Sequence, residues 1–319
     1  VALSDRSLAM PQDAVPPDAS SEVALAVRAL MPVLKRQATL AVGIITLAII
    51  AAAVASMFFL NSGMDGEDRW KMAFLVGIAA FFVVTWTYKW TVRKQEAQVM
   101  PILARAIGFS YSKNAKSFVS TLPRRLLPAR GVRAGEDHVH GTMGAHAIQM
   151  AEVNVETGGK NSRTLFKGIV AQFPNRTAMP AFFVALEDKT RPGFFFGGDL
   201  STEGLFQQST ITGNGGRRYG VWTSWSKLEE PPALTEVVAI LTRIEDHVGS
   251  GAELYAATSN GVEMHIALSH KRNLFHLGGL FPDEIQILRD VRAATQVLSV
   301  PLTLAKLLIE AEAKAAAKS

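Results

Sequence analysis

Histidine is the residue type in this 319-residue sequence best suited to metal binding or proton transfer. His138 and His140 lie two apart in HVHGTM, so on a β-strand they would share one face, and His146 follows after a turn. Zinc needs three or four such ligands with carboxylate or backbone support. Partly exposed strand histidines are the simpler explanation, and we expect no metal site. The same holds for a second, looser group formed by His265, His270 and His276.

Paired carboxylates are the other groups that could carry general acid–base chemistry, provided that two of them converge in a pocket. A hydrolase built from histidines and carboxylates is therefore one hypothesis. Turns and helix caps are the simpler use of such pairs, so we expect them at the edges of elements. The pairs are Glu136-Asp137, Glu187-Asp188, Glu229-Glu230, Glu245-Asp246 and Asp283-Glu284.

Known catalytic and cofactor motifs do not occur in the sequence. Gly213, Gly215 and Gly216 in TGNGGRR lack the Lys-Ser/Thr pair of a phosphate-binding loop. There is no G-x-S-x-G elbow and no H-E-x-x-H pair. Cysteine is absent, which excludes disulfides and cysteine-based metal sites. We therefore expect a non-enzymatic protein with no cofactor.

The net charge of +5 has two interpretations, membrane binding and nucleic-acid binding. The chain has no long Lys/Arg block and no nucleic-acid-binding motif, so we expect no nucleic-acid partner. Part of the excess flanks two apolar runs, where cations bind anionic headgroups. Another part lies in LPRRLLPAR, with Arg124, Arg125 and Arg130. That cluster could contact headgroups or an acidic partner, or form a solvated face.

Two long apolar runs precede the elements that must position these residues. We place the two runs in a transmembrane hairpin over residues 38–90. Ala38 to Leu60 comprises 23 uncharged residues, about 34 Å of helix, enough to cross a hydrocarbon core of about 30 Å. Met72 to Tyr88 comprises 17 uncharged residues, and its flanking lysines extend it. The alternative is a pair of helices buried in a soluble core. Lipid is thus the first expected partner.

Aromatic and cationic residues mark the expected membrane interfaces and the orientation of the hairpin. Cations precede the first span and follow the second, whereas the intervening loop holds Asp65, Glu67 and Asp68. We therefore expect an inner-membrane protein with both termini in the cytoplasm. The interface residues are Arg28, Lys35, Arg36, Trp70, Trp86, Tyr88, Lys89, Trp90, Arg93 and Lys94.

Small residues repeat along the first span at Ala48, Ala52 and Ser56, a spacing that favours close helix packing. The segment before the span divides into a disordered tail, residues 1–19, and a helix, residues 20–37, starting near Ser20 or Ser21. This helix could lie in the membrane plane, with Val27 and Leu34 on its apolar face. It could equally extend the first span, with a kink at Pro32.

The rest of the chain predicts an α+β protein with an antiparallel sheet. Residues 91–134 form a juxtamembrane helix and linker, with Pro101 as a kink or restart and Gly108 as a stop. Residues 135–300 form a cytoplasmic domain, and residues 301–319 a C-terminal helix. Strands are expected within 138–156, 165–173, 179–188, 193–198, 219–225 and 253–268, and amphipathic helices within 231–248 and 283–300. Asn260-Gly261 predicts a type I′ turn in the last hairpin.

Several strings, in order, resemble the bacterial domain-of-unknown-function family 3137. They are PILARAIGFSY after the two spans, the Gly135–Glu156 hairpin, LFKGIVAQF and SHKRNLFHL. The resemblance covers roughly Arg93 to Leu277 and implies two N-terminal spans with a soluble α+β domain. It implies no reaction and no catalytic residue.

Two functions remain open. The first is a membrane anchor that presents its domain to partner proteins, as an accessory or assembly subunit of a larger membrane complex. The second is a membrane-tethered sensor or ligand-binding module, with a pocket lined by Phe194 to Phe196, Trp222 and Trp225.

Overall fold

The computed structural model describes residues 17–63, 65–143, 146–174, 181–190, 200–213, 216–224, 232–242, 252–270 and 283–291, with positions 294, 306 and 310. The described residues form two compact units. One holds two long helices and the helical residues 284–291, and the other holds a nine-stranded sheet. The α+β class with an antiparallel sheet is confirmed. The predicted tail up to residue 16 and the strand within 193–198 lie outside the described residues.

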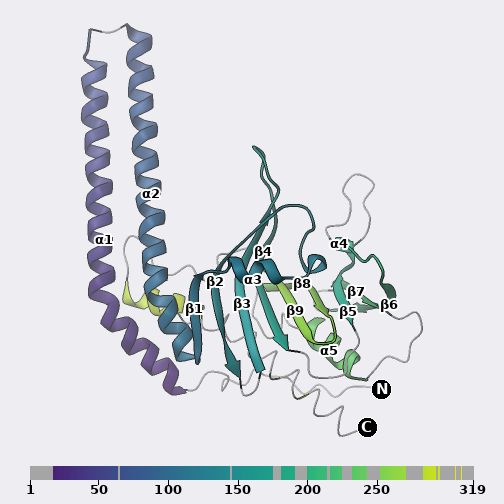
Figure 1. Cartoon of the computed structure of the whole chain (residues 1–319). Coiled ribbons are helices and arrows are strands. Elements are labelled where there is room, and N and C mark those ends of the chain that lie inside the picture. The colour runs from purple at the N-terminus through teal and green to yellow at the C-terminus, as the bar shows by residue number, and fades with distance from the viewer. Residues whose placement is uncertain are drawn as a thin grey trace. The chain divides into compact units, whose positions relative to one another are not determined.

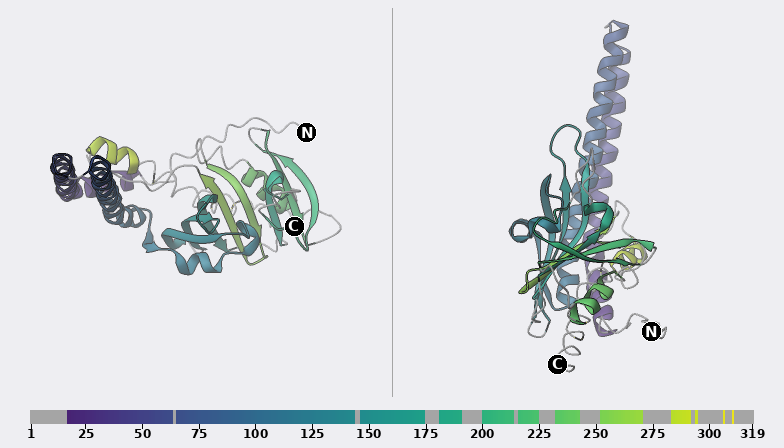
Figure 2. Two further views of the ribbon diagram at one scale, coloured as in Figure 1. Left: turned by 90° about the horizontal axis from the view of Figure 1, so that it is seen from above. Right: turned by 90° about the vertical axis from the view of Figure 1, so that its right-hand side faces the viewer.

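The helical unit is built on α1 (Pro17–Leu60) and α2 (Gly66–Ala106), which lie side by side as a hairpin (Figures 1 and 2). With 44 and 41 residues they are about 66 Å and 62 Å long, twice the thickness of a hydrocarbon core. α2 continues through Pro101 and ends just before Gly108, whose φ of +80° fits the predicted stop.

Burial divides each helix into two parts. From Leu40 to Trp86 most of the large apolar side chains are exposed. Before Ala41 on α1 and after Thr87 on α2, one set of apolar side chains is instead buried inside the unit, while others such as Leu25 stay exposed. We call the first part the membrane belt and the second part the stalk. The stalk core consists of Val23, Val27, Met31, Leu34, Val92, Val99, Met100 and Leu103.

The stalk decides between the two interpretations of residues 20–37. The helix begins at Pro17 rather than at Ser20 and runs without interruption into the first span. Val27 and Leu34, which an in-plane helix would turn toward lipid, are fully buried. The helix is thus an extension of the span, and its N-terminal part bends away from the rest (Figure 1). Pro32 lies inside this helix and can account for such a bend.

A segment from the far end of the sequence belongs to the same unit. Residues 284–291 are helical, and Ile287 and Val291 are buried. Arg28 Nε of α1 forms an ion pair of 2.7 Å with Glu284 Oε1 at the start of this helix. The predicted domain of residues 135–300 is therefore divided, because its last described helix clusters with the hairpin and not with the sheet.

The sheet contains every described strand in a single antiparallel array with the order β1-β2-β3-β4-β9-β8-β5-β7-β6. It is strongly twisted, as the two views in Figure 2 show. The strands are β1 (Phe109–Asn114), β2 (Val132–Met143), β3 (His146–Glu156), β4 (Thr164–Pro174), β5 (Phe182–Leu186), β6 (Phe206–Thr212), β7 (Arg218–Thr223), β8 (Ala252–Ser259) and β9 (Glu263–His270).

Four short helices accompany the sheet in the described ranges. They are α3 (Lys116–Thr121), the 3-10 helix η2 (Arg124–Leu126), α4 (Glu187–Thr190) and α5 (Pro232–Thr242). Phe118 of α3 and Leu126 of η2 pack into one core with Val153 and Phe166 of the sheet. At Gly135 of β2 a Cβ atom would lie only 2.3 Å from Val119, so glycine there lets α3 approach the strand closely.

The strand predictions are confirmed for β2, β3, β4, β5, β7, β8 and β9. The β8–β9 turn differs from the prediction, because Gly261 has a positive φ and Asn260 does not, which excludes type I′. The side-chain oxygen of Asn260 instead accepts hydrogen bonds from the backbone N–H groups of Val262 and Glu263. Strands β1 and β6 were not predicted.

Candidate functional site

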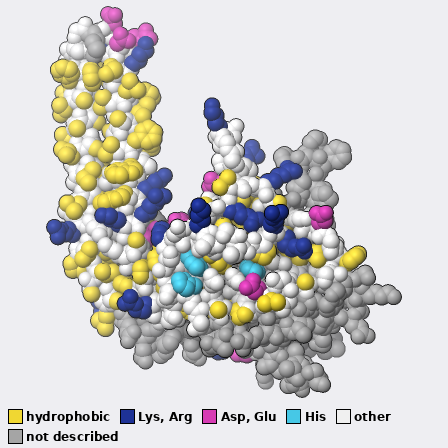
Figure 3. Space-filling view, in the orientation of Figure 1, with side chains coloured by type: hydrophobic (Ala, Val, Ile, Leu, Met, Phe, Trp, Pro, Cys, Tyr) yellow, Lys and Arg dark blue, Asp and Glu magenta, His cyan; other side chains and the backbone are white. Residues whose placement is uncertain are grey.

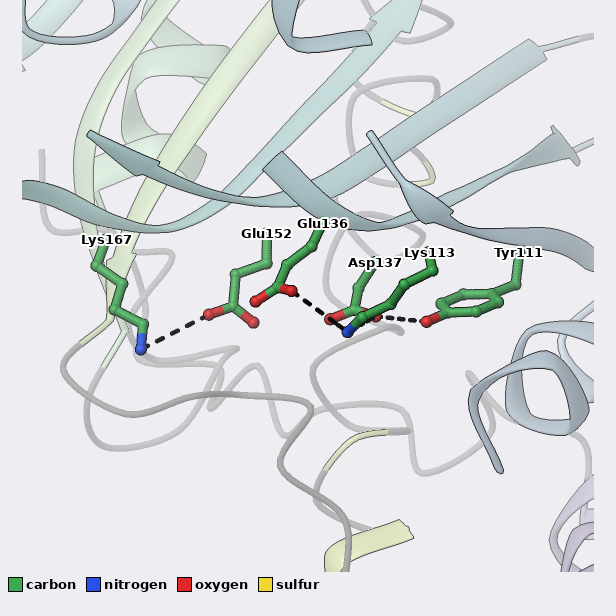
Figure 4. A network of polar contacts seen from close by, with 6 residues as sticks. All are labelled: Tyr111, Lys113, Glu136, Asp137, Glu152 and Lys167. Atoms are coloured by element: carbon green, nitrogen blue, oxygen red, sulfur yellow. Dashed lines mark hydrogen bonds and ion pairs between the residues drawn. The ribbon is translucent and has the colours of Figure 1, made fainter. Parts of the chain in front are cut away.

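The densest group of interacting charged side chains in the described sheet spans β1 to β4 (Figure 4). Lys113 Nζ of β1 lies 3.0 Å from Asp137 Oδ1 and 3.4 Å from Glu136 Oε2, both on β2. The hydroxyl of Tyr111 donates a hydrogen bond to the same carboxylate of Asp137. These contacts tie the edge strand β1 to its neighbour.

A β-bulge makes this cluster possible. Glu136 pairs with Glu152 and Val139 with Met150, so two residues, Asp137 and His138, face a single residue of β3. Asp137 has φ of +56°, unusual for a residue other than glycine. On a regular strand Glu136 and Asp137 would point to opposite faces. The bulge places both carboxylates on the side of Lys113 (Figure 4).

The cluster continues along the same face to β4. Glu152 lies directly opposite Glu136 across the β2–β3 pair. Two carboxylates in direct opposition repel each other unless cations lie nearby. Lys113 supplies one such charge to Glu136, and Lys167 Nζ supplies the other at 3.9 Å from Glu152 Oε1.

Acids on the two inner strands, with a lysine on each outer strand, give this cluster a structural role. Asp137 and Glu152 are almost fully buried, and each has a lysine partner. Buried charges that are paired resist separation, so the contacts hold the register of β1 to β4. The prediction that acidic pairs lie at element edges is therefore wrong for Glu136-Asp137, which lie inside β2 at the bulge.

The predicted histidine pair lies on the opposite face of the sheet. His138 and His140 stack with ring centres 4.9 Å apart, and Phe118 of α3 stacks on His138 at 5.2 Å. Burial lowers the pKa of His138, Gln149 opposes this through a side-chain hydrogen bond, and the nearby His140 lowers it further. Such a stack fits packing better than metal binding.

The other histidines do not join them. His265 on β9 is 3% exposed, and burial lowers its pKa while Glu263 opposes the shift. His270 ends the same strand, whereas the side chain of His146 and all of His276 lie outside the described residues. No three His, Asp or Glu side chains within the described ranges are placed to hold a metal ion.

A cavity of about 700 Å³ in the sheet unit is lined by charged residues that pair with one another. Arg217 Nη2 lies 2.8 Å from Glu253 Oε1, and Arg218 Nε lies 3.3 Å from Glu187 Oε2. Thr210 also donates a hydrogen bond to Glu187. The guanidinium groups of Arg217 and Arg218 in this cavity are thus already paired with carboxylates.

The predicted interface residues cluster at the two ends of the membrane belt. Trp86 and Trp90 stack at 6.5 Å, and Lys94 Nζ lies 4.0 Å above the ring of Trp90. Trp70 is exposed at the opposite end, about 30 Å from Trp90 along the helix. The cations predicted at the interface are all exposed, namely Arg28, Lys35, Arg36, Lys89, Arg93 and Lys94.

Lys71 lies at the loop end of α2, and its positive charge is neutralised there by two acids. Its Nζ lies 2.6 Å from Glu67 Oε1 and 3.8 Å from Asp68 Oδ1, one turn earlier on α2. Ala48, Ala52 and Ser56 are each half-buried along α1, where most neighbouring large side chains are exposed. Their role in helix packing stays a prediction.

No protein-family model matches this chain, and no curated protein matches it. Among solved structures, the chain is similar to one described as the crystal structure of the mycobacterial trehalose monomycolate transport factor A, TtfA. The two are 12% identical, with 63% of this chain and 93% of that chain covered and a TM-score of 0.36. Values this low establish neither a shared fold nor a shared function.

Proposed function

We propose that this protein is a two-pass inner-membrane protein whose α+β domain contacts other proteins in the cytoplasm, as an accessory or assembly subunit of a larger complex. The observation that carries the proposal is the exposed membrane belt (Figure 3). Both helices are long and apolar enough to cross a membrane. In the most apolar 18-residue segment of each helix, only 11% and 6%, respectively, is buried. The core helices of a soluble protein would be mostly buried.

The charges at the two ends of the belt support an orientation with both termini in the cytoplasm. The end with the connecting loop carries Asp65, Glu67 and Asp68, and two of these acids pair with Lys71. The other end, with the adjoining stalk, carries the predicted interface cations, of which Arg28 pairs with Glu284 in the helical residues 284–291.

Membrane topology can be tested cleanly because the natural chain has no cysteine. A Cβ atom at Gly63 in the loop, or at Gly158 between β3 and β4, would meet nothing within 4 Å. We expect a membrane-impermeant maleimide added to intact cells to label Gly63→Cys and to spare Gly158→Cys until the cells are lysed. Labelling of Gly158→Cys in intact cells would reverse the orientation.

The sheet offers an edge for a partner. In the described part of the chain β6 is the strand at one edge of the sheet, and Phe206 at its start is 53% exposed. An edge strand presents unpaired backbone groups that a strand of another protein can extend. The carboxylates of the β1–β4 cluster and of the Arg217–Arg218 cavity are paired with cations, which fits a binding domain better than a catalytic one. The absence of enzymatic activity stays a prediction, as does the resemblance to family 3137.

Purification of the full chain from native membranes in mild detergent tests the partner. We expect at least one other membrane protein to co-purify at stoichiometric level and to be lost in Phe206→Asp. Val262→Asp is the matched control, because Val262 is similarly exposed on the β8–β9 turn. Recovery of the chain only as a monomer would contradict the proposal.

The alternative function is a membrane-tethered ligand-binding module. Of the aromatic residues predicted to line its pocket, Trp222 is buried in the sheet core against Phe183, with ring centres 5.5 Å apart. Phe194 to Phe196 and Trp225 lie outside the described residues. A different cavity in the same unit favours ligand binding.

A further inference from the structure

A cavity of about 850 Å³ lies between α3 and β2, on the face of the sheet that α3 covers. Its basic residues are Lys116 of α3, Arg124 of η2 and Arg133 of β2, and none of its described lining residues carries a carboxylate. Val119 and Leu122 give it an apolar wall. Lys and Arg side chains gather over this face in Figure 3. The volume falls within the range typical of small-molecule sites.

The guanidinium of Arg133 is held in place by the backbone. Its Nη2 donates hydrogen bonds to the carbonyl oxygens of Arg124, at 3.0 Å, and Leu127, at 3.4 Å. Its Nε and Nη1 hydrogens have no partner among the described residues. Arg133 is thus positioned in advance for an acceptor from outside the chain.

The positive charge of this cavity is not compensated within the described chain. Lys116, Arg124 and Arg133 form no ion pair with any described residue, in contrast to Arg217 and Arg218 in the other cavity. Burial lowers the pKa of Arg133, and the nearby charge of Arg124 lowers it further. Like charges brought together at a partly buried site raise the affinity for an anion.

We propose that this cavity binds the phosphate group of a ligand. A guanidinium matches two phosphate oxygens at once, and a lysine adds a point charge, so the three cations suit a phosphate better than a single carboxylate. The apolar wall suits carbon atoms attached to that phosphate. A lipid headgroup and a soluble phosphorylated compound share this chemistry. The proposal does not depend on the partner or the orientation proposed above.

Isothermal titration calorimetry of the full chain in a phosphate-free maltoside detergent tests the site. The probes are glycerol 3-phosphate and dihexanoyl phosphatidate, both soluble, one without and one with acyl chains. We expect binding that falls about tenfold or more in Arg124→Gln and in Arg133→Gln, because each removes charged hydrogen bonds. Arg133→Lys keeps the positive charge but loses the forked hydrogen-bond geometry of the guanidinium. Its affinity should therefore fall between that of the natural chain and that of Arg133→Gln.

Arg218→Gln is the matched control, since it removes one cation from a cavity whose charges are paired. It should leave binding unchanged. Arg124 is exposed, so Arg124→Gln tests the site even if Arg133→Gln disturbs the fold. Tighter binding of phosphatidate supports a lipid ligand, and equal binding of both probes supports a soluble one. No binding of either probe, or binding that Arg124→Gln leaves unchanged, overturns the proposal and leaves a solvated cationic face.

Discussion

Large apolar side chains are mostly exposed on the membrane belt and mostly buried in the sheet unit. Phe81 on α2 is 66% exposed, whereas Phe183 on β5 is fully buried. Of the exposed large apolar side chains in the described chain, all but four lie on α1 and α2. The exceptions are Val132, Phe206, Val262 and Ile285.

The difference is the one expected if the two regions are folded for different solvents, lipid and water. A sheet in water gains stability by removing apolar area from the solvent, at about 25 cal/mol per Å². Helices in lipid gain nothing by hiding such area, and they satisfy every backbone hydrogen bond within themselves. The stalk follows the first rule and the belt the second, although both belong to the same two helices. The boundary between them lies close to Ala41 and Thr87.

The largest effect should come from the sheet core. Phe183→Ala should lower the free energy of unfolding by about 3–5 kcal/mol, because it opens a cavity in a fully buried site. Phe206→Ala is the matched control on an exposed edge strand and should change stability by less than about 0.5 kcal/mol. Urea denaturation of the full chain in detergent, followed by tryptophan fluorescence, measures both. Equal losses would contradict the assignment of the core.

A charge introduced into the membrane belt should have nearly as large an effect, but on the free energy of membrane insertion and not on that of folding. Ile49→Lys places an ammonium near the middle of the first span and should disfavour insertion by about 2.5–3.5 kcal/mol. Leu25→Lys introduces the same charge at an exposed stalk position, where water already solvates the helix. The fraction of chain that resists alkaline carbonate extraction measures insertion. If both variants are extracted equally, the boundary between belt and stalk is misplaced.

The charge cluster should have an intermediate effect. Lys113→Met removes the cation beside Asp137, which is 2% exposed, and should destabilise the sheet by about 1–3 kcal/mol. Lys189→Met is the control, because Lys189 pairs with an exposed acid and should matter by less than about 0.5 kcal/mol. Thermal unfolding of the two variants compares them. A neutral Lys113→Met would mean that the cluster does not hold the register.

The smallest effect should be the pH dependence contributed by His265. Its pKa is lowered on folding, chiefly by burial, so the unfolded chain binds the proton more readily. Stability is therefore complete above the unfolded pKa of about 6.5 and is lost as the pH falls toward the folded value. His265→Gln should reduce this loss between pH 7 and 5. His138, whose pKa is also lowered, leaves part of the slope in place. An unchanged slope would contradict this assignment.

The sequence predicted those features that depend on neighbouring residues. The two apolar runs located the two long helices, and alternation identified most of the strands, because both patterns repeat within one element. Strand β1, FSYSKN, has little alternation and was missed. The β8–β9 hairpin was located by Asn260-Gly261, yet its turn type depended on where the Asn260 side chain bonds.

Features that depend on distant residues could not be predicted. Glu136 and Asp137 looked like a turn, because a bulge inside a strand leaves no pattern in one sequence. Trp222 looked like a pocket residue until the pairing of β5 with β7 brought Phe183 against it. Arg133 was not singled out, since only the packing of α3 and η2 on β2 places it beside Arg124 and Lys116.

By itself the sequence determined which segments can enter a membrane, because an uncharged run of that length satisfies its own backbone and needs no partner. Tertiary structure alone decided how far the helices continue beyond the membrane, which C-terminal segment joins them, and which charges lie together. These outcomes follow from contacts between residues far apart in the chain, such as Arg28 with Glu284 and Lys113 with Asp137. Such contacts are set by the folded backbone and not by local composition.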